Sequence, residues 1–416
     1  MQFVARMLVH SPAFMVSIGF LARILYVAAS HRYRFDLTYW SGFEMAQIGR
    51  HVALGHGFRL LPNCGPSAWS APIYPGVIAL TFRLFGVFSH AAAFFLLVFN
   101  SLFAALTSWT IYRIGRRVCN GTVAAWSGWI WACLPSSIYF SVFWIWETTL
   151  SAFLLSALLL LTLHMEGSDR LLPWCEYGLL WGIAALTNPS LLVWLPFAGS
   201  WLAYRLHLRG LHYLVPAIVS SAIFWLTLTP WLARNYFVFD DPLLIRSGFG
   251  MNLRAGNNPD AQGWWVTSYT LNNPVLLVQY KRLGEAGFDE QQGYFARQWI
   301  ATHPSRFALL CLRRFAYFWI GIPHVQKDGE KNLFSLVFSV LSIGGLVLAL
   351  RRRLPASFLL ASLLVFYPLM YYITFPQPRY RHAIEPEMLL LAMYFVVVTL
   401  TPFRLSISAG KREAFS

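Results

Sequence analysis

Long apolar runs separated by short polar segments follow one another from residue 11 to about residue 402. Runs of about 18–22 apolar residues are long enough to cross a hydrocarbon core of about 30 Å as helices. The pattern predicts spans at residues 11–30, 89–112, 121–140, 148–165, 173–188, 189–205, 212–232, 333–350, 355–374 and 383–402. Segments 72–88 and 306–323 are also apolar, but arginines within them favour helices that lie in the membrane interface. The sequence therefore predicts an all-α polytopic membrane protein with about 10 (10–12) transmembrane helices.

Two polar stretches divide the chain into three parts. Residues 1–232 form an N-terminal transmembrane module that includes a first exported loop at 31–89. Residues 233–332 form a large exported loop with an interfacial helix, and residues 333–416 supply the C-terminal transmembrane helices. We expect the second loop to pack onto the first as a lid.

Composition and charge agree with this class and indicate an orientation. Charged residues make up 12% of the chain, whereas soluble proteins contain about 25%. The net charge of +15 would suit nucleic-acid binding, but the arginines cluster between apolar runs, as the positive-inside rule describes. The rule places both termini in the cytoplasm and both polar loops on the exported face, and the compact size favours a bacterial inner (plasma) membrane. The basic residues assigned to the cytoplasm are Arg6, Arg113, Arg116, Arg117, Arg170, Arg205, Arg209, Arg351, Arg352, Arg353, Arg404, Lys411 and Arg412.

Cysteine and histidine spacing gives no sign of a metal centre. The five cysteines show neither paired nor metal-type spacing, so no disulfide framework is expected. The histidines in the predicted exported loops also lack the spacing of metal ligands. The sequence predicts neither a dedicated metal site nor a cofactor.

Carboxylates are scarce, since 17 of the 416 residues are Asp or Glu, and several of them fall at the ends of predicted spans. A carboxylate inside a bilayer is costly, so a sparse set at one interface indicates chemistry at the membrane surface. Residues 41–54 have a helical pattern and place Glu44 just outside the first span. Glu44 is the candidate general base for an acceptor hydroxyl or amine, with Asp36 as its rival. The alternative is that Glu44 pairs with Arg50 or Arg34.

A second acidic residue lies in the short loop between the third and fourth predicted spans. Glu147 follows Trp144 and Trp146 there. A carboxylate among tryptophans is costly unless it has a partner. We expect it either to contact a substrate or to pair with an arginine from another loop.

The last exported loop carries four candidate ligands for a donor phosphate, namely Arg379, Tyr380, Arg381 and His382. Guanidinium groups bind phosphate oxygens with paired N–H donors. A lipid phosphate would supply such an anion at the membrane interface. The alternative is that the two arginines are satisfied by Glu385 and Glu387.

Two loops complete the set of candidates. Residues 65–75 form a stiff aromatic turn that includes Tyr74. Residues 246–259 are rich in glycine and asparagine, which permits a tight loop with free polar side chains, here Arg254, Asn257 and Asn258. The alternative for this loop is ordinary turn chemistry.

Together these pieces resemble the GT-C superfamily of membrane glycosyltransferases, in the branch near protein O-mannosyltransferases and the bacterial aminoarabinose transferase. The resemblance covers the layout of the whole chain. In detail it rests on Glu44 with Gly55-His56-Gly57-Phe58, on Ala71-Pro72-Ile73-Tyr74-Pro75, on 246–258, and on Arg379-Tyr380-Arg381.

The resemblance implies transfer of a sugar from a polyprenyl-phosphate-linked donor to a protein, glycan or lipid acceptor at the outer face, with inversion at the anomeric carbon. It also implies a catalytic acid in the first exported loop. Glu44 matches that acid best, although it lies about one helical turn later than is usual. Asp36 therefore remains a rival candidate for the catalytic acid. Glu147 takes the place of a second-loop acid, and Arg379 and Arg381 take the place of donor-phosphate contacts.

Two other functions compete with this hypothesis. A transporter or flippase would place ionisable groups near the membrane midplane, and the one acid well inside a predicted span, Glu176, lies near its cytoplasmic end. A scaffold that binds polyprenyl lipids without catalysis would tolerate replacement of Glu44.

Overall fold

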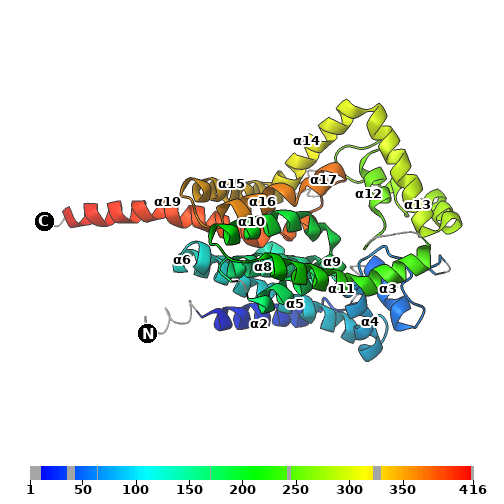
Figure 1. The fold of residues 1–416 in the computed structure, drawn as a ribbon, viewed down its shortest axis with the longest axis horizontal. Helices are drawn as coiled ribbons and strands as arrows, with labels where there is room; N and C mark the ends of the chain where they lie inside the picture. Colours follow the sequence, from blue (N-terminus) through cyan, green and yellow to red (C-terminus); the bar gives the residue numbers. More distant parts are fainter. Residues whose placement is uncertain are drawn as a thin grey trace.

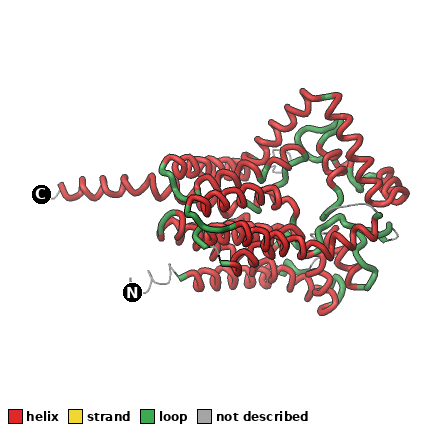
Figure 2. Tube along the Cα trace, in the orientation of Figure 1, coloured by secondary structure: helices red, strands yellow, loops and turns green. Residues whose placement is uncertain are grey.

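The structure is a computed structural model that describes residues 11–34, 43–62, 64–168, 170–240, 245–321 and 329–413. Side chains are described within these ranges except at 43, 329–331 and 401–413. Asp36, the rival catalytic acid, lies outside the described residues. The described part of the chain is helical and contains no strand (Figure 2).

Most helices lie roughly side by side in one bundle, and the remaining helices gather beyond one end of it (Figure 1). The bundle comprises α2 (Pro12–Ser30), α5 (His90–Val118), α6 (Gly121–Cys133), α7 (Pro135–Val142), α8 (Thr148–Met165), α9 (Leu171–Thr187), η1 (Pro189–Trp194), α10 (Leu195–Leu208), α11 (Leu214–Phe239), α15 (Gly329–Arg351), α16 (Ser357–Phe366), α17 (Leu369–Ile373), α18 (Pro378–His382) and α19 (Glu385–Glu413). The helices beyond its end are α3 (Phe43–Ala53), α4 (Ile73–Phe85), α12 (Phe249–Gly256), η2 (Thr267–Tyr269), α13 (Pro274–Thr302) and α14 (Pro304–Ile320).

The prediction of an all-α polytopic membrane protein is confirmed. Among the described residues, 5 helices are long and apolar enough to cross a membrane, namely α2, α5, α8, α11 and residues 332–351 of α15. Several other predicted spans are interrupted. The span at 121–140 is divided between α6 and α7, because Leu134 leaves helical geometry ahead of Pro135, a residue suited to the first turn of a helix. The span at 355–374 is similarly divided between α16 and α17.

A buried arginine holds the break between α6 and α7 against the first helix. Arg23 of α2 is 1% exposed. Its guanidinium donates to the carbonyls of Ala132 (2.9 Å) and Trp131 (3.4 Å) and to the hydroxyls of Ser137 (2.8 Å) and Ser141 (3.2 Å). These carbonyls lie in the last turn of α6, where helix carbonyls lack partners within the helix. The guanidinium therefore supplies hydrogen-bond donors to carbonyls that lack partners within α6, and these carbonyls in turn provide acceptors for the buried guanidinium.

The two polar loops are joined by a buried carboxylate. Glu285 of α13 is 2% exposed. It accepts hydrogen bonds from the Ala68 N–H (2.6 Å), the Ser247 hydroxyl (2.6 Å) and the Tyr280 hydroxyl (2.8 Å). Ala68 belongs to the first loop and the other two donors to the second. The two loops therefore pack together, as the lid arrangement requires.

We expect Glu285→Ala to destabilise the protein. The substitution leaves three buried donors without an acceptor, at a cost of about 1–3 kcal/mol for each one that water cannot reach. The thermal unfolding midpoint in detergent should fall clearly. Glu285→Gln is the matched control, because the amide oxygen still accepts from Ala68 and Ser247 while its N–H group can donate to Tyr280. Equal midpoints for the alanine and glutamine variants would contradict this role.

A second buried arginine ties the helices beyond the end of the bundle to its C-terminal half. Arg314 of α14 donates to the carbonyls of Tyr372 (3.1 Å) and Ile373 (2.8 Å) at the end of α17. It also donates to the Gly256 carbonyl and to Asn257 Oδ1 in the turn after α12. A single side chain thereby fixes α12 relative to α17, and the loop that follows α17 carries residues 377–380.

Candidate functional site

A cavity of about 460 Å³ lies where the loops meet the end of the bundle. Segments far apart in the sequence contribute to its wall, from α3 to α18. Many wall residues are aromatic, and four carry charged side chains, Glu44, Glu147, Arg246 and Arg379. The lining residues are Glu44, Trp69, Trp144, Trp146, Glu147, Asn188, Ser190, Arg246, Phe249, Met251, Asn252, Ala255, Trp265, Thr270, Leu271, Asn272, Met370, Tyr371, Thr374, Phe375, Gln377, Arg379 and Tyr380.

Glu147 lies at this wall immediately before α8. It is 6% exposed, and its Oε2 has no hydrogen-bond partner among the described residues. The loop that carries it is anchored from behind, because the Trp144 carbonyl accepts from Asn100 Nδ2 (2.8 Å). Asn100 in turn accepts from the Tyr74 hydroxyl (3.0 Å). Tyr74, a predicted substrate contact, is buried and does not line the cavity, and it supports the Glu147 loop through Asn100.

Arg379 is held by aromatic rings and keeps a donor free. Its Cζ lies 4.3 Å from the ring centroid of Trp146 and 5.1 Å from that of Tyr380. Such stacking over a ring face stabilises a guanidinium. One Nη atom donates to the Tyr380 hydroxyl at 3.3 Å, while Nε has no partner among the described residues. The cavity therefore contains a positioned cation with an unused N–H group.

Electrostatics couple Arg379 to both carboxylates of the cavity. Burial lowers the pKa of Arg379, but Tyr380, Glu147 and Glu44 outweigh it and raise the pKa above its ordinary value, with Glu147 contributing more than Glu44. Burial raises the pKa of Glu147, and Arg379 and Arg246 oppose that increase. A carboxyl with a perturbed pKa in a cavity, as at Glu147, is typical of functional sites.

Glu44 and Arg246 reach the cavity from the two polar loops. Glu44 projects from the first turn of α3, which ends before Gly55, a residue in the left-handed region at φ 81°. The helix predicted for 41–54 is thus confirmed within its described part. Arg246 donates its Nε to the Trp69 carbonyl at 2.7 Å, so the second loop presents this arginine while bonded to the first.

The structure does not place Arg381 and His382, two of the predicted donor-phosphate ligands, in the cavity wall with Arg379 and Tyr380. Both point into the bundle toward Glu385: Arg381 donates to Oε1 at 3.2 Å, and His382 Nδ1 lies 2.8 Å from Oε2. The imidazole also stacks on Trp131, with centroids 5.3 Å apart. The reason is helical spacing, since residues three and four apart share a face. The alternative pairing with Glu385 is therefore the one observed.

Arg254, Asn257 and Asn258 also lie outside the cavity wall. Both asparagines are 0% exposed, and their amides donate to carbonyls of α12, Asn257 to Leu253 and Asn258 to Arg254 and Ala255. Arg254 stacks over Tyr269, 4.9 Å from the centroid. These residues close the turn after α12, so the turn chemistry considered as the alternative accounts for them.

Several residues of the cavity wall were not predicted as site residues from the sequence. Asn188 and Ser190 line the cavity at the start of η1, where Asn188 Oδ1 accepts from the Ser190 N–H (3.2 Å) and Asn188 Nδ2 donates to Ser151 of α8 (3.3 Å). The Asn-Pro dipeptide that breaks the helix there was a usable signal. Asn252 and Gln377 gave no such signal.

The donor set was also compared with the needs of a metal ion. Among the described residues, no group of three or more His, Cys, Asp or Glu side chains is placed to hold one. The two cavity carboxylates are accompanied by two arginines, whose charge opposes a nearby cation. No step is assigned to a metal here.

Comparison with known proteins identifies the fold. No protein-family model and no curated protein sequence matches the chain. Among solved structures, the chain is similar to the archaeal oligosaccharyltransferase AglB from Archaeoglobus fulgidus, bound to an inhibitory peptide and a dolichol-phosphate, with a TM-score of 0.55 and 13% identity over 96% of this chain. The apo form of that enzyme gives a TM-score of 0.56 at 12% identity over 97% of this chain.

The chain spans about half the length of these oligosaccharyltransferase structures, 52% in both cases. A weaker similarity extends to ArnT from Cupriavidus metallidurans bound to undecaprenyl phosphate, with a TM-score of 0.40, 12% identity, and coverage of 92% of this chain and 77% of that chain.

Proposed function

We propose that this chain, whose fold is that of the GT-C membrane glycosyltransferases, transfers a sugar from a polyprenyl-phosphate-linked donor to an acceptor, with inversion. The observation that carries the proposal is the cavity that combines Arg379, which has a free N–H group, with the carboxylates Glu147 and Glu44. A cation for a leaving phosphate and a base for an acceptor are the two groups that such a transfer needs. The acceptor class (protein, glycan or lipid) is left open.

The phosphate end of the donor is assigned to Arg379 and Arg246. When the bond between the anomeric carbon and the phosphate oxygen breaks, negative charge develops on the phosphate. Preorganised N–H donors aimed at that charge lower the barrier. Arg379 is fixed by Trp146 and Tyr380 before any ligand arrives. The ring-lined wall around it suits the apolar face of a sugar.

Glu44 is assigned as the general base. In an inverting displacement the acceptor attacks the anomeric carbon on the face opposite the leaving phosphate. The base must therefore lie away from the phosphate-binding arginine. Of the two cavity carboxylates, Glu147 directly follows Trp146, the ring that stacks against Arg379, whereas Glu44 enters the cavity from a separate element, α3. Glu147 is assigned to positioning Arg379 and keeping it charged.

The same proposal fixes the orientation in a bacterial inner membrane. Arg205 and Arg209 pair with Glu166, which follows the last turn of α8, whereas Glu147 precedes its first turn. These arginines thus lie at the end of the bundle away from the cavity. The positive-inside rule then assigns the arginine-rich end and both termini to the cytoplasm and the cavity to the exported face.

The deciding experiment measures consumption of lipid-linked sugars by the purified protein in detergent. Several undecaprenyl-phosphate sugars are offered with membrane extract as the acceptor source. Release of free lipid phosphate together with a sugar-modified acceptor is the expected result. Binding of the lipids without release would favour the non-catalytic scaffold, and ATP-independent movement of the intact lipid across vesicles would favour a flippase.

We expect the rate of sugar transfer to decrease on the acidic side of its pH profile, and we expect this acidic limb to depend on Glu147. Because burial raises the pKa of this carboxyl, it loses its charge at a higher pH than a free glutamate, whose pKa is about 4.3. Transfer should therefore decrease as pH falls through a value above that range, and Glu147→Gln should be slower but lack this limb. A pH profile of kcat/KM for both proteins measures it. A limb that persists in Glu147→Gln and disappears in Glu44→Gln would assign the titration to Glu44 instead.

A further inference from the structure

A second cavity, of about 530 Å³, lies between α5 and α8, far from the site described above. It is lined by Trp109, Thr110, Arg113, Arg116, Arg117, Ala157, Leu160, Leu161 and His164. The two helices run side by side in the same direction, since Phe103 contacts Phe153 (centroids 5.1 Å apart) and the cavity residues follow later on both helices. The cavity is therefore formed by the last turns of two parallel membrane helices.

Its depth in the membrane follows from the length of α8. This helix has 18 residues and begins directly after Glu147, while His164 lies in its last turn. At about 1.5 Å per residue the helix is about 27 Å long, close to the hydrocarbon thickness of about 30 Å. If the first cavity lies at one boundary of the bilayer, the second lies at the opposite boundary. That is the level of lipid headgroups.

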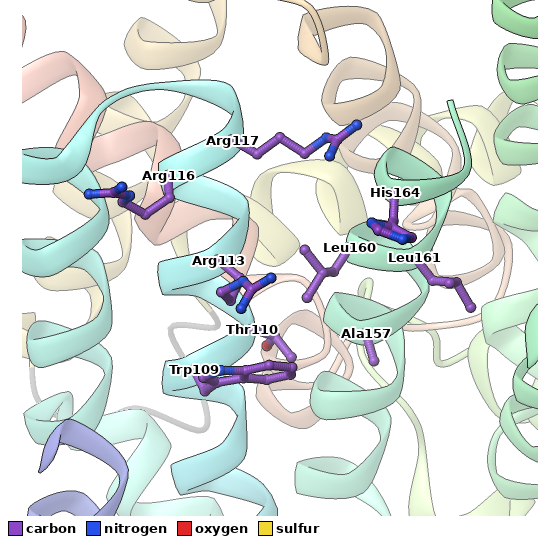
Figure 3. Close-up of a pocket in the computed structure, with 9 residues that line it drawn as sticks. All are labelled: Trp109, Thr110, Arg113, Arg116, Arg117, Ala157, Leu160, Leu161 and His164. Atoms are coloured by element: carbon purple, nitrogen blue, oxygen red, sulfur yellow. The ribbon is translucent and has the colours of Figure 1, made fainter. Parts of the chain in front are cut away.

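The cavity is amphipathic. Leu160, Leu161 and Ala157 provide an apolar wall on α8. Figure 3 shows Arg113 beside this wall, Arg117 extending from α5 across the gap, and Arg116 pointing the other way. Trp109 is 37% exposed at the same place, and Arg113 Cζ lies over its ring, 5.6 Å from the centroid. Tryptophan is typical of the boundary between hydrocarbon and water.

The arginines of this cavity have no acidic partner within the part of the chain that the structure describes. Elsewhere at the same end, Arg205 and Arg209 both pair with Glu166. Within the described residues, the cavity thus concentrates positive charge that no carboxylate pairs with beside an apolar wall. Solvation of a cytoplasmic surface explains exposed arginines, but it does not explain a groove that joins them to Leu160 and Leu161.

From this juxtaposition we infer that the groove between α5 and α8 binds an anionic phospholipid. The phosphate of its headgroup contacts Arg113 and Arg117, with His164 beside it. One acyl chain lies along Leu160, Leu161 and Ala157. Charge, apolar contact and membrane depth all match this ligand class, and none of them depends on the proposed transfer reaction.

The test is native mass spectrometry of the full-length protein in detergent, titrated with phosphatidylglycerol or with phosphatidylcholine. Phosphatidylglycerol should bind at low stoichiometry and phosphatidylcholine weakly. Arg113→Gln/Arg117→Gln should weaken phosphatidylglycerol binding about thirtyfold, because each cation near an anionic lipid contributes about a factor of five. The matched control is Arg351→Gln/Arg352→Gln, which removes two exposed arginines from another turn and should leave the affinity within about twofold.

A second variant separates the groove from charge alone. Ala157→Phe keeps every arginine and fills the apolar part of the cavity, so it should also weaken phosphatidylglycerol binding, by about tenfold for a lost chain contact. Equal affinities for the wild type, the double variant and Ala157→Phe would overturn the proposal. Displacement of the lipid by millimolar inorganic phosphate, with Ala157→Phe unaffected, would also overturn it, by identifying a site for free anions.

Discussion

Replacing Arg379 by glutamine is expected to reduce the rate of sugar transfer about 10²–10³-fold, the usual effect of losing one preorganised donor to a developing negative charge. Arg379 is stacked on Trp146, and its Nε is free within the described structure. Glutamine keeps a polar group but removes the charge and the planar fork. The loss should appear mainly in kcat, measured as release of lipid phosphate by the purified protein in detergent.

Two arginine variants serve as controls for this prediction. Arg379→Lys keeps the charge without the planar fork, so it should recover part of the rate. Arg254→Gln is matched in chemistry, but Arg254 stacks on Tyr269 outside the cavity wall, and it should stay within about threefold of the wild type. If Arg254→Gln and Arg379→Gln reduced the rate of sugar transfer by the same factor, this result would contradict the assignment of the donor phosphate to Arg379.

Replacing Glu44 by glutamine is expected to decrease kcat about 10²–10⁴-fold with little change in donor affinity, because general-base catalysis contributes about that factor. Glu44 lines the cavity from α3, and glutamine preserves its size while removing its ability to accept a proton. The measurement is single-turnover transfer from an undecaprenyl-phosphate sugar, alongside a binding assay for the donor. Glu290→Gln changes an exposed glutamate of α13 and should have no effect on either.

The other two acids decide whether this assignment is right. Asp36→Asn tests the rival from the first exported loop, and full activity is expected for it if Glu44 is the base. Glu147→Gln should lower the rate but leave the base in place. A normal rate in Glu44→Gln together with a dead Asp36→Asn protein would move the base to Asp36 and leave the reaction class unchanged.

The helical architecture was predictable because its signals are local. Apolar runs of membrane length identify α2 and α8 almost to the residue, and the glycine at 55 marks the end of α3. The break at Leu134 was missed although Pro135 was visible. An apolar run continues across such a break, so hydropathy alone does not detect it. What detects it is the set of carbonyls bonded to Arg23, a contact between distant segments.

The site was predictable only in part, because sequence gives residue types and not their partners. Arg379 and Arg381 are two residues apart in one motif, yet Arg379 faces the cavity and Arg381 faces Glu385. Residues two apart on a helix do not share a face, which was a reason to separate them. The positions of Arg246 and Asn188 in the wall were less predictable, because they depend on contacts between segments that are distant in the sequence.

The position of Arg23 has a consequence for how the protein is made. This residue belongs to the first helix, but its partner Ser141 lies 118 residues later in the chain. Until those residues emerge from the ribosome, α2 must enter the membrane with a guanidinium whose partner within the helix is the Gly19 carbonyl (2.8 Å), at a cost of up to about 2.5–3.5 kcal/mol on insertion scales. Its stable insertion is therefore completed late, when α6 and α7 arrive. Completion of the bundle thus depends on hydrogen bonds between segments that are far apart in the sequence.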